Sequence, residues 1–169
     1  MADLAVLVAN IVKLAGGEIT GRVRLQKIAY LLKALGDFDQ NIPFRYHHYG
    51  PYSRALDDGI DVAKALYGIK EDIEYRHIDG MPFSIFRTSE TANIPQIPDR
   101  IAQDILHKLK SQPSTILELA ATIHWLATQE QVNDWRSETV KRKGAKTDGG
   151  RLDRAKSLLD QLGIAPASQ

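Results

Sequence analysis

Histidine and aspartate side chains gather in one stretch of the sequence where they could bind a divalent metal ion. His47 and His48 precede Asp57, Asp58 and Asp61, and imidazoles and carboxylates are both metal ligands. Neighbouring residues of an extended segment point to opposite faces, so His47 and His48 can hardly bind one ion. Asp57 and Asp61 share a helix face, but carboxylates alone do not define a site. We therefore predict no metal site, and a solvated acidic face for the aspartates.

His124 is another histidine that could perform acid–base chemistry. It lies in the apolar run Ala120–Leu126 and shares a helix face with Leu117, where a histidine is usually a hydrogen-bonded core residue. The sequence has no nucleophile-elbow serine, no HExxH motif and no cysteine. We predict a protein without catalytic residues or a cofactor. An enzymatic alternative would combine Asp57, Asp61, His48 and His124.

A basic, glycine-rich stretch between two expected helices could hold an anion. Its core runs from Lys141 to Arg151, and backbone N–H groups near a helix start can bind phosphate. Asp148 stands at the expected N-cap and would compete for those donors, and the spacing matches no P-loop. We predict a solvated helix C-terminus, where cations complement the helix dipole. The alternative is contact with a nucleic acid or an acidic protein through Lys141, Arg142, Lys143, Lys146 and Arg151.

Tyrosines surround the turn Tyr49-Gly50-Pro51-Tyr52-Ser53. Proline fixes its own φ and restricts the residue before it, so this turn is rigid. One interpretation is an aromatic cluster that packs the entry of a helix onto the core. The other is a partner-binding surface, because tyrosine supplies a large, rigid contact area. That surface would consist of Tyr46, Tyr49, Tyr52 and Arg54.

The composition is typical of one globular domain. Of the 169 residues, 43% are hydrophobic and 25% are charged. The 22 basic and 21 acidic residues nearly cancel, so no overall field draws the chain to nucleic acid or membrane. No apolar run is long enough to span a bilayer, and the N-terminus lacks the basic region of a signal peptide. Because the absence of cysteine suits a reducing compartment, we expect a cytoplasmic protein with no membrane partner.

Apolar periodicity predicts three helices in the first part of the chain. The first extends from Asp3 to the Gly16-Gly17 pair, the second from Thr20 or Gly21 to Gly36, and the third begins near Pro51. Asp79-Gly80 between two β-rich runs predicts a hairpin.

Four more helices are expected after the loop at residues 89–98. The first carries Ile101, Ile105 and Leu109. Thr115 with Glu118 and Thr128 with Gln131 have the spacing of capping boxes, and Asp148 could cap the last helix. We predict a single domain, mainly α with a small β-hairpin. A winged-helix-like N-terminal unit over about residues 1–88 would pack with a C-terminal helical bundle over 98–163, followed by a tail over 164–169.

The third helix of a winged-helix unit usually enters the major groove of DNA. Here that helix carries Asp57, Asp58 and Asp61, against only Arg54 and Lys64 as basic residues. Carboxylates facing phosphates are unfavourable, and phosphate contacts dominate DNA affinity. The charge of this helix therefore favours a protein partner.

Two motifs, taken together, resemble those of a known family. They are Arg24-Leu25-Gln26-Lys27-Ile28-Ala29-Tyr30-Leu31-Leu32 and Tyr49-Gly50-Pro51-Tyr52-Ser53, and both resemble the YwgA-like proteins of bacteria and archaea. The later stretch Glu118–His124 fits the same pattern. This family is related to the Panacea group, which includes the SocA antitoxin and proteolytic adaptor. The resemblance covers roughly residues 5–163 and implies a mostly helical domain that acts through protein contacts.

The resulting hypothesis is a non-enzymatic protein-interaction module of antitoxin or proteolytic-adaptor type, with a toxin or a protease component as its partner. The alternative is a winged-helix nucleic-acid-binding protein or transcription regulator that uses the basic segment. Either protein could also form a homodimer.

Overall fold

The computed structural model describes residues 4–36, 41–96 and 103–167, and these residues form a mainly helical protein with two small antiparallel sheets. The helices are α1 (Leu4–Leu14), α2 (Arg22–Leu35), α3 (Arg54–Leu66), α4 (Gln103–Ser111), α5 (Ser114–Thr128), α6 (Trp135–Lys143), the 3-10 turn η1 (Gly144–Thr147) and α7 (Arg151–Leu162). The strands are β1 (Glu18–Thr20), β2 (Arg45–His47), β3 (Gly50–Tyr52), β4 (Ile69–Tyr75) and β5 (Pro82–Thr88).

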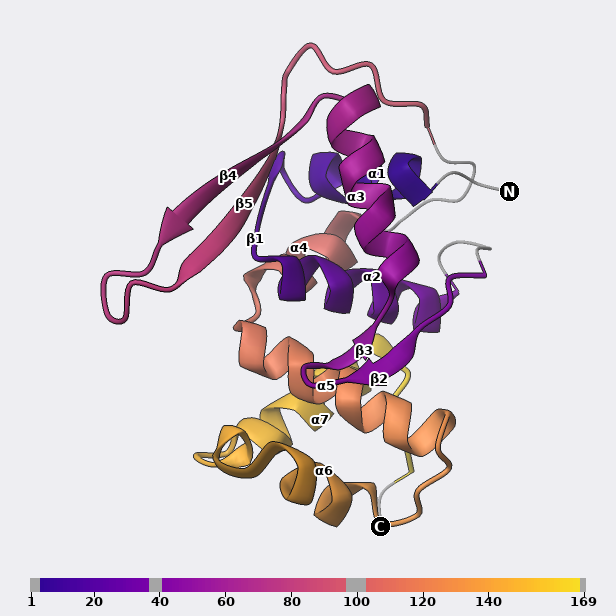
Figure 1. Cartoon of the computed structure of the whole chain (residues 1–169). Coiled ribbons are helices and arrows are strands. Elements are labelled where there is room, and N and C mark those ends of the chain that lie inside the picture. Colours follow the sequence, from indigo (N-terminus) through magenta and orange to yellow (C-terminus); the bar gives the residue numbers. More distant parts are fainter. Residues whose placement is uncertain (1–3, 37–40, 97–102, 168–169) are drawn as a thin grey trace.

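Helix α2 lies across the middle of the molecule, with α1 and α3 on one side and α5, α6 and α7 on the other (Figure 1). Every residue from Leu25 to Leu32 is buried, including the polar Gln26 and Lys27. The core continues into α1 and α5, which are buried over most of their length. Gly59 of α3 permits close packing against α1, because an added Cβ would lie 3.0 Å from the Cβ of Leu4.

The larger sheet contains three strands in the order β1-β5-β4. The hairpin predicted at Asp79-Gly80 is present, with Tyr75 paired to Pro82 at its end, and it projects away from the helices (Figure 1). Strand β1, which pairs Ile19 with Phe86, was not predicted. It is only three residues long and lies between two glycine-containing turns, so no alternation of apolar residues marks it.

The smaller sheet consists of β2 and β3, which lie directly before α3 and are packed against α2 and α5. The expectation that α3 begins near Pro51 is wrong, because Pro51 belongs to β3 and pairs with Tyr46. Ser53 is the N-cap of α3, and its hydroxyl accepts a hydrogen bond from the Leu56 N–H at 3.3 Å. A serine hydroxyl can satisfy a free helical N–H, which proline cannot do.

The predicted capping devices of the C-terminal helices are also corrected. Helix α5 begins after Pro113 without a side-chain cap, and Glu118 is instead buried within an ion-pair network. Thr128 lies at the end of α5 and donates to the His124 carbonyl at 2.7 Å. Helix α6 is capped by Asp134, and α7 follows Gly150 rather than Asp148. Ile101 lies outside the described residues, whereas Ile105 and Leu109 are in α4 as expected.

Gly50 is required both by its own backbone and by its neighbour on α5. Its φ is +86°, in the region that side chains with a Cβ disfavour. A Cβ at this position would lie 2.8 Å from Thr122 Oγ1, in a buried part of α5. The β2–β3 hairpin therefore packs on α5 at a distance that only glycine permits.

We predict that Gly50→Ala lowers the free energy of unfolding by about 3 kcal/mol, the sum of backbone strain and the clash with α5. Gly80 is the matched control, because its φ is +68° and no atom lies within 4 Å of its added Cβ. Gly80→Ala should therefore lose only about 1 kcal/mol, from strain alone. Urea denaturation of both variants measures the difference, and equal losses would contradict a close contact between Gly50 and α5.

Candidate functional site: the pocket beside the tyrosine turn

The two motifs that carry the family resemblance contact each other in the structure. Gln26 of α2 donates to the Ser53 carbonyl at 2.8 Å and accepts from the Ser53 N–H at 3.0 Å. The next residue, Lys27, donates through Nζ to the Pro51 carbonyl at 2.5 Å. Side chains of α2 therefore bind polar groups of the backbone at the junction of β3 and α3, which fixes the position of the turn.

A second buried lysine, on α6, contacts the same turn. Lys143 of α6 donates to the His48 carbonyl at 3.0 Å and to Glu118 Oε1 at 2.8 Å. Lys146 also donates to Glu118, with both distances at 3.0 Å. Glu118 on α5 is the carboxylate common to these contacts, and only 5% of its side chain is exposed.

Lys27 is the least compensated charge of this group. Its side chain is among the largest that are fully buried, and burial lowers its pKa to about 8. The carboxylate of Glu118 opposes this shift, and the cation of Lys143 adds to it. The buried network around the turn therefore contains more positive than negative charge.

The tyrosines at the turn divide into one structural residue and two that line a pocket. The ring of Tyr46 lies beneath the Arg142 guanidinium, 4.7 Å from centroid to Cζ, and its centroid is 6.5 Å from that of Trp125. Its hydroxyl oxygen is buried, so the polar end of Tyr46 is not accessible to a partner. Tyr49 is 49% exposed, and Tyr52 donates to Asp57 Oδ2 at 2.6 Å.

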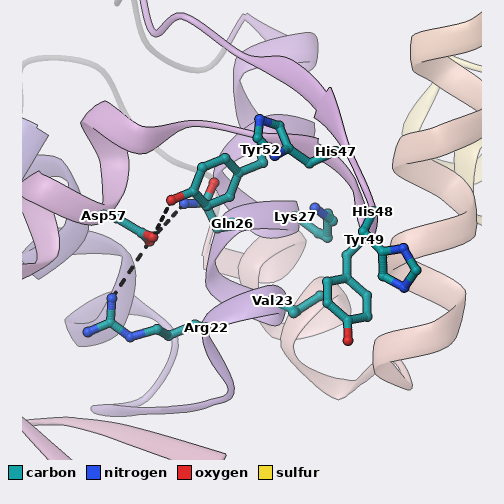
Figure 2. A pocket seen from close by; sticks show the side chains of 9 residues that line it. All are labelled: Arg22, Val23, Gln26, Lys27, His47, His48, Tyr49, Tyr52 and Asp57. Carbon is teal, nitrogen blue, oxygen red and sulfur yellow. Dashed lines mark hydrogen bonds and ion pairs between the residues drawn. The ribbon is translucent and has the colours of Figure 1, made fainter.

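Tyr49 and Tyr52 flank an open pocket of about 250 Å³ (Figure 2). Val23 and Tyr49 lie on one side of it, Tyr52 lies on the other, and Lys27 is between them (Figure 2). The lining is completed by residues from α2, the β2–β3 turn and α3: Arg22, Gln26, His47, His48 and Asp57. Such a pocket, largely apolar with a few fixed polar groups, can accept a side chain or a small molecule.

Most of the basic residues in the segment predicted for anion contact have partners within the protein. Arg142 binds Glu130 at 2.6 Å and Glu138 at 2.8 Å, and Lys143 and Lys146 bind Glu118. Arg151 donates to the Ala145 and Lys146 carbonyls, both at 2.7 Å. In the described parts of the chain, Lys141 is the member of the predicted set whose side chain makes no such contact. These side chains hold η1 and the ends of the neighbouring helices in place.

The four residues of the enzymatic alternative are not gathered into one site, because His124 lies apart from the other three. Asp57 and His48 line the tyrosine pocket, whereas Asp61 lies 3.8 Å from Arg22 and from Lys64. His124 lines a separate pocket, where its Nδ1 is 2.8 Å from the Tyr30 hydroxyl.

Burial determines the titration of this His124–Tyr30 pair. It lowers the pKa of His124 and raises that of Tyr30, so both side chains are held in their neutral forms. Across residues 4–36, 41–96 and 103–167, no three histidine, cysteine, aspartate or glutamate side chains are close enough to hold a metal ion.

Comparison with protein-family models finds no family that matches this chain, and comparison with curated proteins finds no match either. The resemblance to the YwgA-like family therefore remains a hypothesis. In the part of the chain that the structure describes, no helix is both long and apolar enough to cross a membrane.

Sequence reasoning placed Tyr49 and Tyr52 at the site but missed the structural roles of Gln26, Lys27 and Glu118. The apolar run Ile28–Leu32 was a usable signal, because a helix that is apolar all round is buried on every side. Polar residues next to such a run must then find buried partners.

We predict that the burial of Lys27 makes the free energy of unfolding depend on pH in the alkaline range. Its folded pKa of about 8 is below the ordinary value of 10.5, so the native state releases the proton first as pH rises. The free energy of unfolding should therefore increase between pH 8 and 10.5 by about 2 kcal/mol relative to Lys27→Met. Denaturation at several pH values measures this gain. Lys70→Met, which removes an exposed lysine of β4, should follow the wild-type profile, and a parallel profile for Lys27→Met would contradict the prediction.

We also predict strong coupling between Glu118 and Lys143. Glu118→Leu should destabilise the protein by about 4 kcal/mol, because it leaves a buried ammonium group without its carboxylate. Adding Lys143→Met to this variant should restore more than half of the free energy of unfolding that Glu118→Leu loses. A double-mutant cycle by chemical denaturation measures the coupling, and simple additivity of the two losses would show that the pair is not coupled.

Proposed function

We propose that this protein is a non-enzymatic protein-interaction module of antitoxin or proteolytic-adaptor type, and that a protein partner binds at the tyrosine pocket. The observation that carries this proposal is the open pocket between Tyr49 and Tyr52, built on a turn that buried side chains hold in place. An exposed tyrosine such as Tyr49, on a fixed backbone, provides binding energy at a low entropic cost. The resemblance to the YwgA-like family supports the same class of function.

We further propose that the N-terminal part of the chain is a winged-helix unit. The order α1, β1, α2, α3, β4, β5 and the sheet order β1-β5-β4 support this assignment. The β2–β3 hairpin is an addition between the second and third helices. Because of this hairpin, the tyrosine pocket lies next to α3, the helix that a DNA-binding winged-helix protein would use to contact the major groove.

The contacts of the basic segment favour a protein over a nucleic acid as the partner. Binding of nucleic acid depends on neutralising phosphates with free cations. Here Arg142, Lys143 and Lys146 are already paired with carboxylates of this chain. The exposed Asp58 and Asp61 add negative charge to α3.

We predict that Tyr49→Ala weakens binding of the partner by about 30-fold, as expected for loss of an aromatic hot spot. The partner would be recovered by affinity purification of the full chain and its affinity measured by calorimetry. Tyr75→Ala is the matched control, because Tyr75 is 65% exposed but lies on the projecting β4–β5 hairpin. Unchanged affinity of Tyr49→Ala, with a native fold, would exclude the tyrosine pocket as the binding site.

A further inference from the structure

A second hollow lies directly beside the tyrosine pocket and has a different chemical character. It has a volume of about 590 Å³ and is lined by Pro43, Arg45, His47, Tyr52, Arg54 and Ala55. Among the described residues, no aspartate or glutamate lines it. His47 and Tyr52, whose ring centroids are 4.9 Å apart, line both spaces and therefore form the wall between them.

The two arginines of this hollow differ from most other arginines in the described residues. Arg22, Arg76, Arg87, Arg136 and Arg142 bind carboxylates, and Arg24 and Arg151 bind backbone carbonyls. The side chains of Arg45 and Arg54, like that of Arg154 on α7, make none of these contacts in the described residues. Both guanidinium groups are thus free to bind an external anion.

Arg45 and Arg54 come from different elements, and both line this hollow. Arg45 and His47 alternate with Tyr46 along β2, so they share the face opposite to the buried Tyr46 hydroxyl. Arg45 is also paired with Tyr52 across the ladder. Arg54 is the first residue of α3, where the helix dipole adds positive potential. In the described parts of the chain, Tyr52 donates its hydrogen bond to Asp57, which lines the tyrosine pocket and not this hollow, and the charge of Asp58 also acts on Tyr52.

We propose that Arg45 and Arg54 bind a carboxylate group of an acidic segment of the protein partner, next to an apolar side chain of that segment seated between Tyr49 and Tyr52. This inference rests on the proposed function, which it extends by naming the chemistry that the partner presents. Guanidinium groups match a carboxylate with two parallel hydrogen bonds, which gives both affinity and orientation.

Charge complementarity selects a short acidic segment over a nucleic acid. A nucleic acid carries a charge at every nucleotide and would have to continue past Asp58 and Asp61 of α3. In a peptide with one or two acidic residues, the negative charge is confined to the part that lies in the hollow. Its neighbouring residue would then meet the largely apolar tyrosine pocket across the His47–Tyr52 wall.

The test uses a fluorescein-labelled peptide that carries one glutamate beside one phenylalanine in an otherwise neutral, polar sequence, titrated with the full chain and followed by fluorescence anisotropy. We expect Arg45→Gln and Arg54→Gln each to weaken binding about tenfold, as loss of a charged hydrogen bond would. Arg154→Gln is the matched control, since it removes an arginine that is also exposed and unpaired in the described residues, and it should bind as the wild type does. A control peptide with glutamine in place of glutamate should bind the wild-type protein as weakly as the acidic peptide binds the arginine variants.

The outcomes separate this inference from the proposed function. If both arginine variants bind the acidic peptide as the wild type does while Tyr49→Ala does not, the inference is wrong and the tyrosine pocket stands. If the arginine variants lose affinity but Tyr49→Ala retains it, the acidic site stands and the tyrosine pocket does not. Absence of binding to the wild type, or tighter binding of an oligothymidylate of equal length that depends on Arg45 and Arg54, would overturn the acidic-segment proposal.

Discussion

The structure depends on one buried interaction, the pairing of two α2 side chains with the backbone of the β3–α3 junction. Gln26 and Lys27 supply partners for Ser53 and Pro51, whose polar groups are buried by the surrounding helices. Unpaired backbone groups at that depth would each cost the free energy of a lost hydrogen bond. The turn therefore has one low-energy position relative to α2, and this position also determines the shape of the pocket beside it.

Charge placement follows from the same interaction. A lysine can bind the Pro51 carbonyl only by bringing a cation into the interior, where Glu118 partly compensates it. Glu118 in turn binds Lys143 and Lys146, so the basic segment is folded back onto the protein. The positive charge of the basic segment from Lys141 to Arg151 is for this reason largely neutralised in the structure. The free positive charge next to the turn is found instead at Arg45 and Arg54, of which the sequence had indicated Arg54 but not Arg45.

The parts of the fold that sequence could predict are those set by local patterns. Apolar periodicity found the core helices, and Asp79-Gly80 located the larger hairpin, where Gly80 has a positive φ although residues 76–81 form a longer connection than a two-residue turn. The capping boxes failed for a tertiary reason: Glu118 has the spacing for a local hydrogen bond but forms a buried ion pair with a residue 25 positions away. Pro51 suits the first turn of a helix equally well, yet β3 is favoured because its carbonyl receives Lys27. At the site, the tyrosines were visible in sequence, whereas their supports depend on contacts between distant helices.

The packing of Gly50 against Thr122 and the hydrogen bond from Lys143 to the His48 carbonyl are further supports of the turn that come from the later part of the chain. The residues that line it all belong to the first part of the chain, but the helices that press on the turn are synthesised much later. A nascent chain that has emerged only as far as β5 carries every lining residue without α5 and α6 to hold the turn. In such a nascent chain the turn is held by α2 alone, and its full set of supports is complete only after α5 and α6 have folded.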